Sequence, residues 1–202
     1  MASLDLTRLL NNARVHLPGA IDSNLQLELF NVLNDFFQGS NIWQEAISFQ
    51  VKAADLLGTV YSIENQSIAS MVRLISLANS AALPVSATMA VPGDIILNTK
   101  VSNDDMLTAT VSLTVNDPTT KDGYPEFPSW TLNKYGTGIL DGLIGRMMMQ
   151  PAKPWTNSQL AIFRTRRFNG VVSQAKFEAL HKSLNNGQTW RFPQSFNARR
   201  GR

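Results

Sequence analysis

Residues 135–145 read YGTGILDGLIG, with four glycines in eleven positions. Such a run is either a phosphate-binding loop of a nucleotide-dependent α/β enzyme or a helix that another backbone approaches closely. The phosphate-binding loop needs a Lys-Ser or Lys-Thr pair after its last glycine, and none follows. The dinucleotide fingerprint needs Gly-x-Gly-x-x-Gly after a strand, but the glycine after Gly138 comes one residue too late, at Gly142. We therefore interpret the run as a helix.

On this helix Gly138, Gly142 and Gly145 recur at intervals of four and three, so they share one face. Each glycine costs a helix about 0.5–1 kcal/mol relative to alanine, so three of them indicate a close neighbour. That neighbour is either another helix of the same chain or a second subunit, and the sequence leaves both open. The methionines 147–149 beside them are interpreted as filling of the core rather than as a copper site.

Apolar residues spaced by three and four predict a helix at about 22–38. Asp22 or Ser23 is expected to cap its start, and Gly39 is expected to end it. Its expected buried face consists of Leu25, Leu29, Val32, Leu33 and Phe36.

Three further elements are expected on either side of the middle of the chain. A short element at 4–17 precedes a Pro-Gly turn. The glycine-rich helix is expected at about 128–150, and a last helix at about 155–184, capped by Thr156 or Asn157.

The middle of the chain, at about 43–116, alternates apolar and polar residues and predicts antiparallel strands. The expected strands are 43–51, 58–63, 70–77, 85–91, 94–97 and 107–115, with a turn at Pro92-Gly93. In the third strand, Val72, Leu74 and Ser76 are expected to share one face. The clearest face is that of the last strand: Leu107, Ala109, Val111, Leu113 and Val115.

The order of these elements predicts an α+β protein by segregation. We expect a helical bundle with an inserted antiparallel β region, forming a single domain over 1–187. The remaining residues, 188–202, lack periodicity and are expected to be an extended C-terminal arm.

Charge divides the chain into an acidic body and a basic end. Residues 1–154 hold 9 Lys/Arg and 14 Asp/Glu, whereas residues 155–202 hold 9 Lys/Arg and one acid. The basic turn with Arg164, Arg166 and Arg167 is either a solvated face or a contact with an anionic surface. In the arm, aromatic and basic side chains alternate as in binding hot spots: Trp190, Arg191, Phe192, Phe196, Arg199, Arg200 and Arg202.

The sequence offers little for catalysis. With no cysteine, thiolate chemistry and zinc–thiolate sites are excluded for this chain. The two histidines, His16 and His181, belong to no metal-binding or catalytic-triad motif. The acidic pair Asp104-Asp105 is expected to be solvated. We expect neither an enzyme nor a cofactor or metal. No apolar run approaches the length of a membrane span, and no secretory signal is recognised, so a soluble protein without a membrane partner is expected.

Several segments together resemble the head-to-tail adaptor proteins of short-tailed bacteriophages. They are ARVHLPGAIDSNLQLELFNVLNDFF, GYPEFPSW, PSWTLNKYGTGILDGLIGRMM, QPAKPWTN and the arginine-rich end. The resemblance implies a virion protein, made in the bacterial cytoplasm, that forms a twelve-fold ring at the head–tail junction. Its implied partners are further copies, the portal protein, the tail nozzle protein and the genomic double-stranded DNA in the channel.

Under this resemblance, the arm residues named above would grip the portal, and the helices would form the bundle and the ring contacts. Two other functions stay open: a basic-tailed protein that binds double-stranded DNA, and a neck or head-completion protein of another tail type. An enzyme with an unrecognised site is a further alternative, which any turnover would support.

Overall fold

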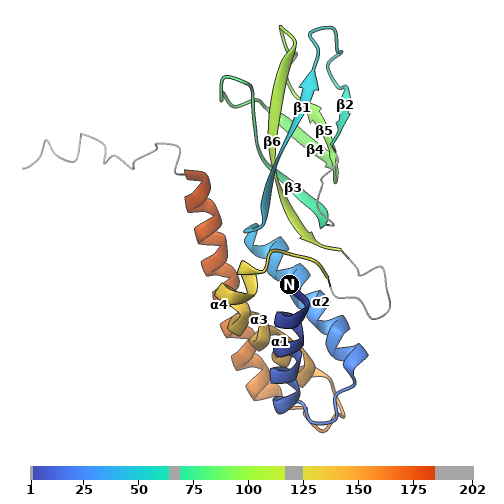
Figure 1. Ribbon diagram of the computed structural model, residues 1–202, viewed down its shortest axis with the longest axis vertical. Coiled ribbons are helices and arrows are strands. Elements are labelled where there is room, and N and C mark those ends of the chain that lie inside the picture. Colours follow the sequence, from blue (N-terminus) through green and yellow to red (C-terminus); the bar gives the residue numbers. More distant parts are fainter. Residues whose placement is uncertain (1, 64–68, 117–124, 185–202) are drawn as a thin grey trace, which may run out of the picture.

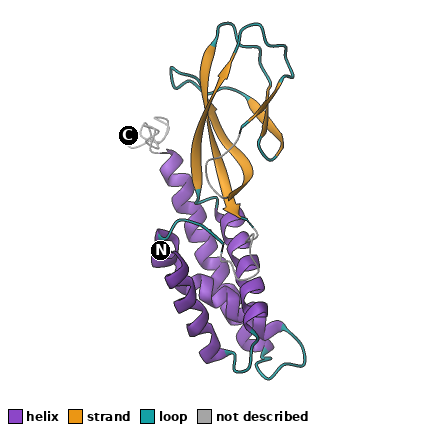
Figure 2. Ribbon diagram, turned by 45° about the vertical axis from the view of Figure 1, so that its right-hand side comes forward, coloured by secondary structure: helices purple, strands orange, loops and turns teal. Residues whose placement is uncertain are grey.

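The computed structural model describes residues 2–63, 69–116 and 125–184. Within them the protein is α+β: the helices gather at one end of an elongated molecule and the strands at the other (Figure 1 and Figure 2). The elements are α1 (Ala2–His16), α2 (Asp22–Ser40), β1 (Gln44–Val51), β2 (Val60–Ser62), β3 (Ala69–Ala78), β4 (Ala87–Val91), β5 (Asp94–Leu97), β6 (Asp105–Val115), α3 (Trp130–Met149) and α4 (Ser158–Leu184). No helix in these ranges is long and apolar enough to cross a membrane.

The first helix, α1, is the short element expected at 4–17, shifted by one or two residues toward the N-terminus. Apolar residues of α1, with Leu17 just after its end, recur at spacings of three and four and make one buried face: Leu6, Leu9, Leu10, Ala13 and Leu17. Gly19 then has φ +82°, a left-handed conformation that glycine adopts without steric cost. The chain can therefore reverse within a few residues and run back as α2.

The second helix, α2, confirms the predicted helix and its buried face. All five predicted apolar residues are at most 1% exposed: Leu25, Leu29, Val32, Leu33 and Phe36. The predicted cap is wrong, because Ile21 holds the N-cap position and no side chain caps the helix. The Asp22 carboxylate instead accepts hydrogen bonds from Arg14 of α1, the shorter at 2.7 Å, and so joins the two helices.

The predicted end of α2 at Gly39 is also wrong. The helix continues through Ser40, and Asn41 closes it with φ +51° and an N–H donated to the carbonyl of Phe37. Gly39 has a packing role instead, because a Cβ there would lie 2.8 Å from Val172 Cγ1 of α4. Gly39 is therefore a contact between two helices rather than a helix stop.

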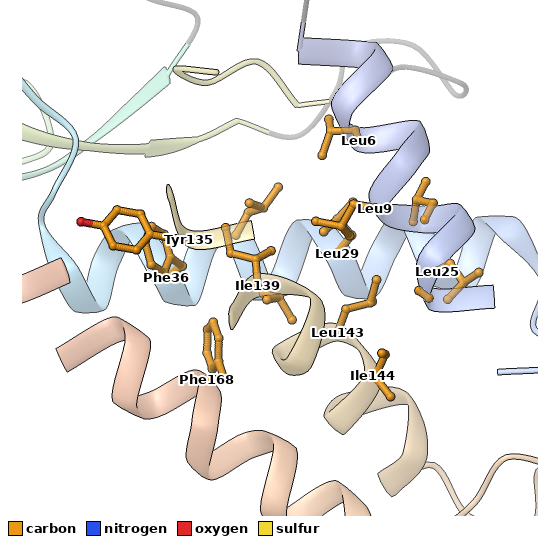
Figure 3. Close-up of a cluster of buried hydrophobic side chains, with 14 of the residues drawn as sticks. Leu6, Leu9, Leu25, Leu29, Phe36, Tyr135, Ile139, Leu143, Ile144 and Phe168 are labelled. Carbon is orange, nitrogen blue, oxygen red and sulfur yellow. The ribbon is translucent and has the colours of Figure 1, made fainter. Parts of the chain in front are cut away.

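Figure 3 shows the helical core, in which side chains from all four helices point toward one another. Aromatic rings of α2 connect it to neighbouring elements. Phe36 lies 5.3 Å from Tyr135 of α3, and Phe37 lies 5.3 Å from Trp43 at the start of β1, between ring centroids. Trp43 also packs against the core of the β region, so one side chain contacts both hydrophobic clusters.

The strands form two three-stranded antiparallel sheets, ordered β1-β6-β3 and β2-β5-β4. In the first sheet β6 is central, and its predicted inner face is confirmed at 0–2% exposure: Leu107, Ala109, Val111, Leu113 and Val115. The opposite face is polar, yet Ser112 and Thr114 are also buried. The hydroxyl of Thr114 donates to Asn34 Oδ1 of α2 at 2.6 Å, so this end of β6 packs on the helices.

The face predicted for the third strand is wrong. In β3 the most buried residues are Ala69, Met71 and Leu77, rather than the set at 72, 74 and 76. Two register shifts against β6, between residues 71 and 73 and between 74 and 76, each insert an extra residue. Each bulge exchanges the two faces of the strand. Buried and exposed residues therefore do not alternate regularly along β3.

The second sheet confirms the predicted turn at Pro92-Gly93, where Gly93 has φ +95° and β4 reverses into β5. Ile95 and Leu97 of β5 are buried and complete the core of the β region. The two sheets thus enclose an apolar interior, and the first sheet connects that interior to the helices.

The last two helices lie within the expected ranges of 128–150 and 155–184. Asn157 is the cap of α4, as one of the two predicted alternatives, because its Oδ1 accepts from the N–H of Leu160 at 3.0 Å. The Thr156 hydroxyl instead donates to the carbonyl of Gln150 at 2.6 Å and stabilises the loop between the helices.

Candidate protein-interaction surface

The three glycines on one face of α3 lie directly against α4. A Cβ at Gly138 would be 2.6 Å from Val171, and a Cβ at Gly142 would be 2.8 Å from Phe168. Real Cβ atoms do not approach other atoms so closely, so only glycine lets α4 lie at this distance. The neighbour at both positions belongs to the same chain, which is the internal alternative of the two left open by the sequence.

The third glycine of this face, Gly145, makes the same kind of contact one turn further on. A Cβ there would be 3.0 Å from Thr165 Oγ1 and 3.3 Å from the carbonyl of Ala161. Close contact over two turns of helix fixes both the separation and the rotation of α4. One set of α4 side chains is therefore held inward, and the opposite set is presented outward.

A buried carboxylate adds an electrostatic contact between the same helices. Asp141 of α3 is 3% exposed, and its Oδ1 accepts from Arg164 Nη1 at 2.5 Å. Its Oδ2 lies 3.1 Å from Arg167 Nε, without the alignment of a hydrogen bond. A buried carboxylate needs such compensation, because its desolvation is otherwise costly.

This ion cluster corrects the interpretation of the basic turn. The solvated-face alternative is wrong for Arg164, which binds this internal carboxylate with a side chain that is 16% exposed. Arg167 also lies beside the carboxylate, but its side chain is 51% exposed and so remains solvated. Arg166 is exposed and has no ion pair with the described residues. No role for Asp141 is predicted from the sequence, because its pairing with Arg164, 23 residues away, depends on how the two helices cross.

A second polar contact holds the C-terminal half of α4. The Glu178 carboxylate accepts hydrogen bonds from Lys134 and, at 2.9 Å, from the hydroxyl of Tyr135. The hydrogen bond from Lys134, followed by that from Tyr135, lowers the pKa of Glu178. Burial, and then the bond to Glu178, raises the pKa of Tyr135.

The outward side of α4 carries exposed apolar side chains over most of its length. We call this set the α4 outer face, and its exposed fractions are large: Ile162 45%, Phe163 57%, Phe177 63% and Leu180 53%. Arg166 lies between them, at helical spacings that put it on the same side. Figure 1 shows α4 along one side of the helical end. Large apolar side chains presented on a rigid helix are typical of a binding surface.

Two rings of the α4 outer face have neighbours on α4 itself. Phe177 stacks edge-on against His181, with 4.0 Å between ring centroids, and the guanidinium of Arg167 lies 5.9 Å from the ring of Phe163. These contacts hold the rings in place while leaving their outer surfaces accessible. The face is therefore apolar in its rings and cationic between and beside them.

The predicted arm continues directly from α4 but lies outside the described residues. This applies to all seven side chains assigned to portal binding: Trp190, Arg191, Phe192, Phe196, Arg199, Arg200 and Arg202. The structure therefore places the glycines of the predicted site and leaves the arm as a prediction.

The last feature concerns the acidic and histidine side chains of the described residues. No group of three or more His or acidic side chains in these ranges could hold a metal ion. In the pair at 104–105, Asp104 accepts from the N–H of Ala53 at 2.8 Å and so closes a loop of the β region. Tyr61 donates to Asp55 at 2.9 Å, and burial raises the pKa of Tyr61 to about 12. These carboxylates have evident structural roles.

No known protein-family model matches the sequence, and the search of curated proteins found no match.

Proposed function

We propose that this chain is a structural virion protein, the head-to-tail adaptor of a short-tailed bacteriophage. Twelve copies form a ring at the head–tail junction, with the portal protein on one side and the tail nozzle protein on the other. Genomic double-stranded DNA passes through the ring without sequence-specific contacts.

In this proposal the four helices act as the adaptor bundle, with the β region inserted between α2 and α3. Residues 188–202 act as the extended arm, and its apolar side chains are buried against the portal. Its aromatic side chains serve as anchors, and its arginines pair with carboxylates of the portal. The arm also adds affinity through multivalency, because a ring offers many arms to the portal at once.

The observation that carries the proposal is the α4 outer face. Phe163 and Phe177 are more than half exposed on a helix that glycine contacts and Asp141 hold rigidly. A second copy is a suitable occupant, because residues 1–154 of each copy have an excess of five acids that complements the cationic groups of this face. Such a head-to-tail contact between different surfaces generates a ring when the rotation between neighbouring copies closes, and in this proposal it closes after twelve copies.

Two kinds of variant test these roles separately. Truncation after Asn186 should abolish co-sedimentation with the portal protein of the same virus and leave the thermal unfolding transition unchanged. The double variant Phe163→Glu/Phe177→Glu should instead prevent ring formation, measured by analytical ultracentrifugation. Val15→Glu is the control for adding charge at an exposed apolar residue that is not part of the α4 outer face, because Val15 is 79% exposed on α1. A truncated protein that still binds the portal would refute the role of the arm.

The DNA-binding alternative is favoured by the basic C-terminal quarter, but two of its arginines already neutralise Asp141. That alternative requires affinity for duplex DNA that falls steeply with salt. The adaptor should show only weak binding that is independent of DNA sequence. Tight, salt-sensitive binding by the isolated chain would replace our proposal with the alternative.

A further inference from the structure

The fourth glycine of α3, Gly136, is not explained by the packing of the described residues. A Cβ at Gly136 would meet no atom within 4 Å, in contrast to the three glycines that face α4. The backbone there is helical and requires no left-handed conformation. The helix therefore loses about 0.5–1 kcal/mol relative to alanine with no internal contact in return.

Gly136 instead lies in a notch between α1 and α3. The notch has a volume of about 310 Å³ and is open to solvent. Its apolar wall consists of Leu9, Leu132 and Leu140, and its remaining lining is polar: Arg8, Asn12, Asn133 and Thr137. This volume is at the lower limit of ligand pockets, so it fits a side chain better than a cofactor.

The polar lining of the notch is rich in hydrogen-bond donors. Arg8 offers a guanidinium, which only donates, whereas the amides of Asn12 and Asn133 and the hydroxyl of Thr137 can donate or accept. None of the four side chains bonds to a side chain or backbone group that the structure describes, and the lining contains no acid. The Arg8 guanidinium favours an anion with acceptor oxygens, and the amides and hydroxyl can each donate a further hydrogen bond to it.

The charges around the notch favour a single carboxylate over a nucleic-acid backbone. The other cationic side chains of the two helices are already paired: Arg14 with Asp22, Lys134 with Glu178, and Arg146 with Asp35 and Glu28. Arg8 alone is left without an ion pair to a described side chain. One guanidinium matches one carboxylate in a two-pronged contact, whereas a phosphate backbone is bound by several cations in a row.

We propose that this notch binds the carboxylate of an Asp or Glu side chain from an acidic peptide segment of a partner protein. Arg8 binds the carboxylate, the neighbouring amides and hydroxyl supply further donors, and the leucine wall contacts an adjacent apolar side chain. The absent side chain of Gly136 leaves room for the peptide. This site lies on the α1–α3 side of the bundle and does not depend on the adaptor function proposed above.

The test uses two blocked dipeptides and two-dimensional NMR of the full chain. N-acetyl-leucyl-glutamate amide carries the carboxylate and an apolar neighbour, and N-acetyl-leucyl-glutamine amide is its neutral counterpart. The signals to follow are the amides of Gly136 and Thr137 and the side-chain Nε–H of Arg8. The glutamate peptide should bind at least about 10-fold more tightly, as expected for one charge-assisted hydrogen bond.

Two variants and a matched control test whether the peptide binds in the notch. Gly136→Leu fills the notch and Arg8→Gln removes the cation, and each should weaken glutamate-peptide binding at least about 10-fold. Gly170→Leu is the control, because Gly170 is helical like Gly136 and its Cβ would also meet nothing within 4 Å. It should change binding less than about 2-fold. Equal binding of the two peptides, loss of binding with Gly170→Leu, or stronger shifts of these signals by a 12-base-pair duplex would each overturn the proposal.

Discussion

Replacing Gly138 by alanine should destabilise the protein even though alanine is the better helix former. The new Cβ would lie 2.6 Å from Val171 Cγ2 and 2.7 Å from both Cγ1 and Cβ. Rotating the valine cannot relieve the contact, because its Cβ is fixed by the backbone. The helices must move apart, which costs about 1–3 kcal/mol, and the gain in helix propensity returns about 0.5–1 kcal/mol.

Taking the middle of each range, the expected net loss for Gly138→Ala is about 1 kcal/mol, a fall in Tm of about 2–4 °C for a chain of this size. Differential scanning calorimetry of the variant and the parent measures it. Gly170→Ala is the matched control, because it has the same propensity gain and no contact, and it should raise Tm by about 1–3 °C. If Gly138→Ala were as stable as Gly170→Ala, the close approach of α3 and α4 would be refuted.

Two further predictions concern the polar contacts between α3 and α4. Asp141→Asn should lower the free energy of unfolding by about 2–4 kcal/mol in urea titrations, because it leaves Arg164 without its carboxylate, while Arg166→Gln should change it by less than about 0.5 kcal/mol. Equal effects of the two would contradict the role of the buried ion cluster. The pKa of Glu178 is lowered by its hydrogen bonds, so its contribution to stability is complete above its ordinary pKa of 4.5 and is lost as pH falls through the lower folded value. The Tm of Glu178→Gln should consequently fall less than that of the parent between pH 7 and pH 3, and parallel curves would exclude this linkage.

The fold class and most elements followed from periodicity, because a buried helix face or strand face repeats locally. The apolar residues of α2 and β6 were recognised for this reason, and both sets are buried. The face of β3 was missed because its two bulges depend on pairing with β6, which local alternation does not encode. Gly39 was misassigned for a similar reason, since its role is set by Val172, which is distant in the chain.

The candidate surface was less predictable than the fold. The shared face of the α3 glycines was visible in their spacing, but the identity of the neighbour required the position of α4. Asp141 carried no signal, because a single acid in an apolar helix has no evident partner until the basic turn of α4 lies beside it. The α4 outer face is recognised only from the exposed fractions of its side chains, because the sequence alone is equally consistent with their being part of the core.

Electron microscopy of the full chain mixed with the portal protein of the same virus tests the central claim most directly. Our account predicts twelve-fold class averages in which a ring of this chain covers the tail-facing end of the portal and surrounds an open channel. Portal particles without added density, with this chain left as monomers, would contradict it.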